Sequence, residues 1–145
     1  MASRSLPLTS SGRIVAATGV LFLLDTFLPW HRLCVGVQDA KVCRVDQAWD
    51  TSFSTLAALL VLALVAEVIA VQVAGLRLPD LGRRTWGQAR LAVSAAATLL
   101  VLLQLLVGDG NLDRAYGSVL GLFLVVGLTY GNYLRISEST AVLSR

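Results

Sequence analysis

The stretch that decides the fold is residues 52–76, SFSTLAALLVLALVAEVIAVQVAGL, in which Glu67 is the only charged residue. A helix needs about 20 mainly apolar residues to cross a bilayer, and this stretch has no polar face to turn towards water. Its long runs of Leu, Val and Ala also lack the alternation of a half-buried strand. The segment is therefore predicted to be a transmembrane helix.

Three further windows of the chain have the same character. They lie at about residues 13–32, 90–108 and 115–135, and the only acidic residue within them is Asp25. Because a backbone inside hydrocarbon must satisfy its own hydrogen bonds, such segments adopt helices. We expect an all-α fold, a four-helix transmembrane bundle that forms one domain over residues 1–145.

The composition of the whole chain agrees with a membrane protein. Of its 145 residues, 56% are hydrophobic and 14% are charged. A soluble domain carries about 25% charged residues, so a water-soluble enzyme is not expected. The chain is poor in Lys and Ile and rich in Ala, Leu, Val, Gly and Arg, which is typical of a high-GC bacterial genome. We expect a multi-pass protein of the bacterial plasma membrane, surrounded by membrane lipid.

The basic residues outside the apolar stretches predict the orientation. Eight of the twelve Lys and Arg residues lie near the termini or between the second and third spans: Arg4, Arg13, Arg77, Arg83, Arg84, Arg90, Arg135 and Arg145. Basic residues favour the cytoplasmic side, so both termini are predicted to be cytoplasmic and the loops 31–51 and 109–115 to lie outside. Nucleic acid is not an expected partner, because the arginines are split among three short segments.

Cys34 and Cys43 are the only cysteines of the chain, and both fall in the predicted outer loop. Two such thiols in an oxidising compartment most often form a disulfide, which would stabilise the loop by about 2–3 kcal/mol. The alternative is a redox pair, although membrane thiol oxidoreductases use a C-x-x-C spacing that is absent here. A metal site is not expected, because His31 is the only further soft ligand nearby.

Asp25 lies near the predicted outer end of the first span, shortly before Pro29 and Trp30. We expect Trp30 to anchor this end at the membrane interface. A carboxylate at this depth should face the bundle or a polar crevice, and Arg114 begins the fourth span at a similar depth. We predict an Asp25–Arg114 ion pair that fixes the packing of these spans, with a binding crevice at the outer face as the alternative.

Glu67 lies past the middle of the second span, towards the cytoplasm, and no basic residue is expected at its depth. It should therefore be protonated or bonded to polar side chains of other spans, for which Gln104, Tyr130 and Asn132 are the candidates. The first interpretation is a structural hydrogen bond between helices. The alternative is the proton-carrying carboxyl of a transporter.

The fourth span contains two Gly-x-x-x-Gly patterns, Gly117 to Gly121 and Gly127 to Gly131. Small residues at this spacing let helix backbones approach closely. One strip is expected to pack inside the protomer and the other against a partner. The third span offers another small-residue surface at residues 94–98, and we expect the two spans to pack together there.

Two resemblances follow from these motifs. Residues 25–30 (DTFLPW), Trp49 and residues 114–117 (RAYG) resemble uncharacterised four-span membrane proteins of actinobacteria, whose first span ends D-x-F-L-P-W and whose fourth begins R-x-Y-G. This resemblance covers most of the chain, implies the architecture without an activity, and supports the Asp25–Arg114 pair. Residues 66–70 (AEVIA) more weakly resemble small multidrug resistance exporters, in which the glutamate exchanges protons against cationic drugs.

Motifs of the common enzyme classes are missing from the sequence. It has no phosphate-binding loop, no zinc-protease motif and no Ser/His/Asp set, and its single histidine leaves little for acid–base catalysis. We predict no enzyme activity, no cofactor and no metal. The expected function is that of an accessory or assembly component, as a homo-oligomer or within a larger membrane complex; the alternative is a proton-coupled small-molecule transporter that uses Glu67.

Overall fold

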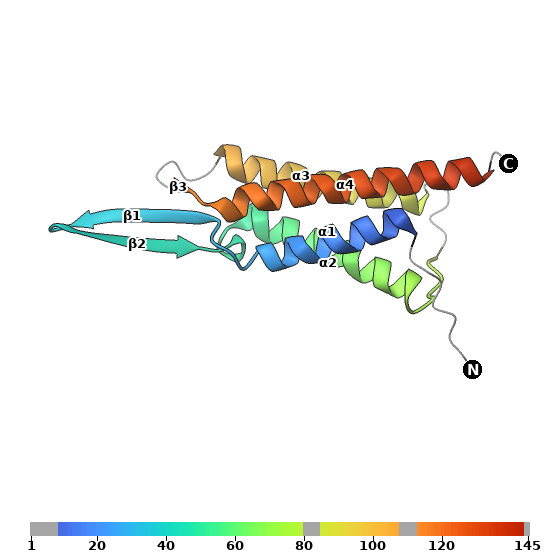
Figure 1. Cartoon of the computed structure of the whole chain (residues 1–145), viewed down its shortest axis with the longest axis horizontal. Helices are drawn as coiled ribbons and strands as arrows, with labels where there is room; N and C mark the ends of the chain where they lie inside the picture. Colours follow the sequence, from blue (N-terminus) through green and yellow to red (C-terminus); the bar gives the residue numbers. More distant parts are fainter. Residues whose placement is uncertain (1–8, 80–84, 108–112, 144–145) are drawn as a thin grey trace.

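The computed structural model describes residues 9–79, 85–107 and 113–143, and most of these residues are helical (Figure 1). The helices are α1 (Ser10–Asp25), α2 (Ser52–Gln72), α3 (Trp86–Val107) and α4 (Tyr116–Leu143). Between α1 and α2 lie the strands β1 (His31–Val37) and β2 (Ala40–Asp46) and the short 3-10 helix η1 (Ala48–Asp50). A two-residue strand, β3 (Asp113–Arg114), precedes α4.

The four helices lie lengthwise beside one another, and each runs antiparallel to the next in the chain (Figure 1). Helix α1 packs against α2 and α4, and α3 packs against the same two helices. The start of α1 and the end of α4 lie at one end of the bundle, which we call the terminal end. The β1–β2 hairpin projects from the opposite end, which we call the hairpin end (Figure 1).

Three of these helices are long and apolar enough to cross a membrane: Ser52–Gln72, Trp86–Val107 and the Tyr116–Glu138 part of α4. The first predicted span, 13–32, is wrong at its outer end, because α1 stops at Asp25 and residues 31 and 32 already belong to β1. The 16 residues of α1 cover about 24 Å at 1.5 Å per residue. That is less than the bilayer core, which is about 30 Å thick.

Pro29 explains why α1 ends early. In a continuing helix its ring would clash with the carbonyl of the residue four positions earlier, which is Asp25, and would offer no N–H to that carbonyl. The Asp25 carbonyl instead accepts hydrogen bonds from the backbone N–H of Leu28 at 2.9 Å and from Trp30 Nε1 at 3.0 Å. The chain therefore turns here and enters β1.

The hairpin corrects the all-α prediction. β1 and β2 pair antiparallel from His31↔Asp46 to Val37↔Ala40. Gln38 and Asp39 form the turn, both with positive φ angles, 41° and 67°, as two-residue hairpin turns of the favoured primed class require. β1 also pairs with β3 on its other side, next to the bundle.

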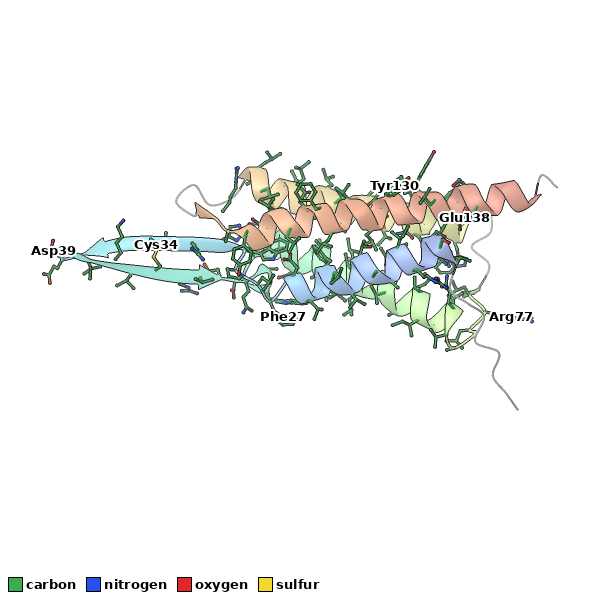
Figure 2. The ribbon with its side chains drawn as sticks, viewed as in Figure 1. Phe27, Cys34, Asp39, Arg77, Tyr130 and Glu138 are labelled. Carbon is green, nitrogen blue, oxygen red and sulfur yellow. A yellow bond between two sulfur atoms is a disulfide. The ribbon has the colours of Figure 1, made fainter. Side chains whose placement is uncertain are left out.

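The predicted disulfide is confirmed. Cys34 and Cys43 stand directly opposite each other in the register of the two strands and are bonded to each other. Figure 2 shows the sulfur atoms part-way along the hairpin, with Asp39 at its tip. The bond therefore closes a hairpin that extends well beyond the helices.

The glycines of α4 bring α1 close to its backbone. A Cβ at Gly117 would lie 2.6 Å from the carbonyl oxygen of Pro29, and one at Gly131 would lie 2.9 Å from Val15 Cγ2 of α1. Gly121 faces Trp30 and Gly127 faces Thr18 in the same way. All four glycines thus pack against α1 or the segment that follows it, so the prediction that one strip serves a partner is wrong.

Helices α3 and α4 meet through hydroxyl groups and at Gly87 of α3, which faces Ile136, whereas the four glycines of α4 face α1 and the segment that follows it. The hydroxyls of Thr98 and Thr129 lie 2.9 Å apart, and Thr98 also donates to the carbonyl of Val125 at 3.2 Å. Ser94 and Ala97 of the predicted small-residue surface are buried, whereas Ala95 and Ala96 are exposed. The two spans pack together as expected, but through a different face of α4.

The outward faces of the bundle are apolar. Large exposed side chains such as Leu62, Leu99 and Phe123 line them, and the central turns of the described helices carry no exposed charged residue. Apart from Phe123, the exposed and partly exposed aromatic residues lie towards the two ends: Phe27, Trp49, Phe53 and Tyr116 at the hairpin end, and Trp86, Tyr130 and Tyr133 at the terminal end. An apolar band between two aromatic belts is the surface of a protein embedded in a bilayer.

The contact at Gly117 predicts a sharp sensitivity to one methyl group. Gly117→Ala should destabilise the bundle by about 1–3 kcal/mol, because the new Cβ meets a backbone carbonyl that cannot move aside without shifting Pro29. Gly36→Ala is the matched control, since a Cβ there meets nothing within 4 Å. Thermal unfolding of the purified variants in detergent measures the difference. Equal midpoints for the two variants would contradict the packing described here.

Candidate functional site

The segment of residues 25–30 connects the elements of the hairpin end. The backbone N–H of Trp30 donates to the carbonyl of Asp46 in β2 at 3.0 Å, and the carbonyl of Trp30 accepts from Ala115 at 3.0 Å. The carbonyl of Pro29 accepts from Gly117 N–H at 3.1 Å. This segment, which we call the junction, therefore ties the hairpin to the start of α4.

The junction is tied to η1 as well. The carbonyl of Thr26 accepts from the backbone N–H of Ala48 at 3.2 Å, and its hydroxyl accepts from Trp49 Nε1 at 3.0 Å. Phe27 packs against Trp49, with ring centroids 6.2 Å apart. Trp49 is 37% exposed at the entrance of α2, in keeping with an interface anchor.

Trp30 is a core residue and not the interface anchor that the sequence suggested. None of its surface is exposed. Its ring packs edge-on against Phe22, with centroids 6.1 Å apart and planes at 78°. Its indole N–H donates a hydrogen bond to the backbone carbonyl of Asp25. The ring covers Gly117 and Gly121 of α4, which have no side chains that would exclude it.

Asp25 lies under this ring. It is 2% exposed, and a Cβ at Gly121 would lie 2.7 Å both from Asp25 Oδ2 and from Trp30 Cζ2. The carboxyl and the indole therefore share one narrow space against α4. Neither carboxyl oxygen has a hydrogen-bond partner among the described residues.

The predicted Asp25–Arg114 ion pair is wrong. Arg114 is exposed, and its backbone pairs with His31 in the small sheet. Pro29 and Trp30 occupy the space between the end of α1 and the start of α4, so the guanidinium is held on the outside. The sequence placed both residues at the correct end of the bundle but could not show the tryptophan between them.

At the terminal end, Glu67 of α2 is paired with Arg90 of α3. Arg90 Nε donates to Oε2 at 2.9 Å and Nη2 donates to Oε1 at 2.5 Å, which is a bidentate, charge-assisted contact. The two side chains are only 14% and 16% exposed. The expectation that no basic residue reaches Glu67 is therefore wrong, because antiparallel packing sets the first turns of α3 beside the last turns of α2.

The polar partners suggested for Glu67 lie elsewhere. Gln104 is buried on α3, but it stands about 21 Å further along that helix than Arg90 at 1.5 Å per residue. Tyr130 points outward from α4 and is 58% exposed (Figure 2). Asn132 is buried, and neither of its side-chain polar atoms has a partner in the described part of the chain.

Arg135 of α4 extends the pair into a cluster. Its guanidinium interacts electrostatically with Arg90, Glu67 and Glu138. Glu138 in turn accepts a hydrogen bond from the hydroxyl of Ser11 in α1 at 2.6 Å. Each of the four helices thus contributes a polar side chain, and the two arginines balance the two glutamates. We call Ser11, Glu67, Arg90, Arg135 and Glu138 the terminal cluster.

The terminal cluster was missed because its arginines stand at the borders of the predicted spans. The basic-residue pattern assigns Arg90 to the connection between the second and third spans and Arg135 to the carboxyl-terminal tail. The signal that could have found Arg90 is the antiparallel pairing of α2 and α3: Glu67 lies shortly before the end of α2 and Arg90 shortly after the start of α3. Residues at equal distances from a helix–helix connection face each other in such a pair.

Neither polar site has the composition of a metal centre. No set of three or more His, Cys, Asp or Glu side chains suited to a metal ion occurs in the described residues. Comparison of the chain with known protein families, with curated proteins and with solved structures finds no match. The resemblances to the actinobacterial proteins and to the small multidrug exporters stay predictions, and the function has to be inferred from the geometry.

The ion pair of the terminal cluster should behave as a coupled unit. Glu67→Gln or Arg90→Gln alone should destabilise the protein by about 1–3 kcal/mol, because each leaves a poorly solvated charge behind. The double variant should be more stable than the sum of the two losses predicts. Thermal unfolding of the parent and the three variants in one detergent completes a double-mutant cycle, which gives the interaction energy between Glu67 and Arg90.

The control is Arg44→Gln, which removes the other ion pair of the described residues. That pair joins Arg44 to Asp46 at 2.8 Å on the hairpin, where the arginine side chain is 77% exposed. An exposed pair contributes little, so the unfolding midpoint should not change. Additive losses for Glu67 and Arg90 would show that the contact contributes nothing.

Proposed function

We propose that the chain is an accessory or assembly component of the plasma membrane, without enzyme activity, that presents its hairpin to a partner outside the membrane. In this proposal all four helices cross the bilayer and both termini are cytoplasmic. The observation that carries it is the hairpin itself, a disulfide-closed projection from a bundle whose other outward surfaces suit lipid.

The packing of α1 supports its role as the fourth span. It lies between α2 and α4, and its buried residues follow one helical face, including Gly12, Val15 and Gly19. Its opposite side exposes Val20, Leu21 and Leu24, as the other helices expose their leucines. Beyond Asp25, Phe27 and Trp49 continue the apolar surface to the hairpin end, which compensates for the short helix.

The disulfide supports the proposed orientation independently of charge. Disulfides persist on the oxidising side of a membrane and are rare in the cytosol, so the hairpin belongs outside. Arg13, Arg77, Arg90 and Arg135 then lie towards the cytoplasm, in accord with the positive-inside rule.

The hairpin has the surface of a binding element. Val35, Val37 and Val42 lie on one face of it, with 51%, 54% and 61% of their surfaces exposed. In the order β2-β1-β3, the outer edge of β2 has no neighbouring strand in the described part of the chain. An open edge beside exposed valines suits the addition of a strand from another protein.

The alternative, proton-coupled transport by Glu67, has less support. A proton carrier must release and regain its proton during each cycle. Two guanidinium N–H groups of Arg90 donate hydrogen bonds to the Glu67 carboxylate, which is thereby engaged between two helices. The terminal cluster is better suited to joining the helices than to carrying protons between two aqueous sides.

Labelling of the two native cysteines tests the orientation. After reduction of intact cells with a membrane-impermeant phosphine, an impermeant maleimide should label Cys34 and Cys43. The control is the cysteine-free chain with Leu76→Cys, because Leu76 follows α2 at the terminal end and is 59% exposed. That thiol should react only after the cells are opened. The reverse pattern would overturn the proposed topology.

Photo-crosslinking from the hairpin tests the proposed role. A diazirine amino acid in place of Val42 should give one discrete protein adduct in native membranes, because this side chain lies on the proposed binding face. The same group in place of Leu62, on the outward face of α2, should react with lipid. Adducts of equal yield and identity at both positions, or lipid adducts alone at Val42, would contradict a role for the hairpin in recognition.

A further inference from the structure

Asp25 is a buried acid that the rest of the protein does not compensate. Its two carboxyl oxygens have no hydrogen-bond partner among the described residues. Arg114, which the sequence predicts as the partner of Asp25, is exposed in β3. Burial of an ionised carboxylate without a partner is very costly. Glu67, at the other end of the bundle, differs from Asp25, because its carboxylate accepts two hydrogen bonds from the guanidinium of Arg90.

The hydrogen-bond donors around the junction are already engaged. Trp30 Nε1 donates to the Asp25 backbone carbonyl at 3.0 Å, and the hydroxyl of Thr26 donates to the carbonyl of Leu23 at 2.6 Å. The buried hydroxyl of Ser118, one turn from Gly121, donates to the carbonyl of Ala115 at 2.8 Å. The carboxyl of Asp25 therefore receives no bond from Thr26 or Ser118, and the indole N–H of Trp30, although close enough to interact with the carboxyl, is directed to the backbone carbonyl.

The titratable groups of the neighbouring elements do not supply a charge to Asp25 either. On the strands, Asp46 is paired with Arg44, and Arg32 and Arg114 are exposed. On η1, the carboxylate of Asp50 accepts from the backbone N–H of Gln47 at 2.7 Å. His31, which follows Trp30 in the chain, is buried and is itself titratable, so it is tested separately below. The facing residues of α4, Gly117, Ser118 and Gly121, carry no charge.

We propose that Asp25 is a proton-binding site, at which the uncharged carboxyl lets Trp30 pack against α4 and so holds the hairpin to the bundle. The bound ligand is a proton from the outer side. Loss of that proton leaves a carboxylate that must draw in water or take the indole N–H from its present acceptor. Either event displaces the Trp30 ring from the space that it shares with Asp25 and Gly121.

The junction carries such a displacement directly to the hairpin. Trp30 binds β2 through its backbone N–H and the start of α4 through its carbonyl. A shift of this residue therefore loosens the attachment of both. The outer origin of the proton rests on the proposed orientation of the bundle, whereas the attachment of the hairpin at Trp30 is the same whatever the hairpin binds.

The direction of the pH effect follows from linkage. The protonated carboxyl is the form that fits under Trp30, whereas the carboxylate of the unfolded chain is solvated, so the stability of the junction falls as the pH rises. Raising the pH should release Trp30 and the hairpin, and lowering it should restore them.

Fluorescence quenching of Trp30 by acrylamide is the test. Trp49→Phe and Trp86→Phe leave Trp30 as the single tryptophan of the otherwise full chain, reconstituted in nanodiscs. Its quenching constant should rise several-fold between about pH 5 and about pH 9. Asp25→Asn in this background has the same shape without the charge, so quenching should stay low across the whole range.

Two control variants identify the group responsible. Asp46→Asn and His31→Gln in the same background should both keep the rise, since neither removes the carboxyl under Trp30. The proposal is overturned if Asp25→Asn keeps the rise, if His31→Gln abolishes it, or if quenching does not change with pH in the parent.

Infrared spectroscopy of the single-tryptophan protein gives a second readout, which does not depend on whether the Asp25→Asn variant folds. The carbonyl band of a protonated carboxyl should be present at low pH and should disappear over the same range as the quenching rises. Absence of this band at the pH where Trp30 is protected would also overturn the proposal.

Discussion

The packing of Pro29 and Trp30 against the glycines of α4 is the contact on which the hairpin end depends. The proline ends α1 at Asp25, the tryptophan fills the space that this leaves, and Gly117 and Gly121 allow the ring to reach the helix backbone. The hydrogen bonds of the same two residues then fix β2 and the start of α4. A short first helix and a projecting hairpin are therefore consequences of one local packing arrangement.

Elsewhere the bundle is held by the interactions that work inside a membrane. Lipid chains are as apolar as leucine, so burial of leucine gives little preference for helix association, and close approach of small residues and polar contacts matter more. Gly19 and Gly131 bring α1 against α2 and α4, Thr98 and Thr129 join α3 to α4, and the terminal cluster joins all four helices. Leucines such as Leu62 and Leu99 are left on the outside.

The sequence was sufficient for the features that depend on composition over many residues. Hydropathy located α2, α3 and α4, and the two cysteines indicated their disulfide. It failed where one residue decides the path of the chain. Hydropathy predicts a first span that continues to about residue 32, although the ring of Pro29 acts on the carbonyl four residues earlier and ends α1 at Asp25. The hairpin was also not evident, because Gln38-Asp39 is not the usual sequence for a hairpin turn. The partners of Asp25 and Glu67 depended on which helix faces meet, which periodicity alone does not give.

Buried Asp25 and partly buried Glu67 show how an acidic side chain is accommodated differently at the two ends of one bundle. Glu67 lies within reach of an arginine whose long side chain extends from the first turns of α3, and the pair that they form joins the two helices. Asp25 has a shorter side chain, and Trp30 separates it from Arg114, so charge is the costly state there. The pair at the terminal end joins two helices, whereas the lack of a partner for Asp25 makes the junction the place where we propose that a proton binds. The hairpin is attached at that junction, which places the proposed binding element next to the proposed proton-binding site.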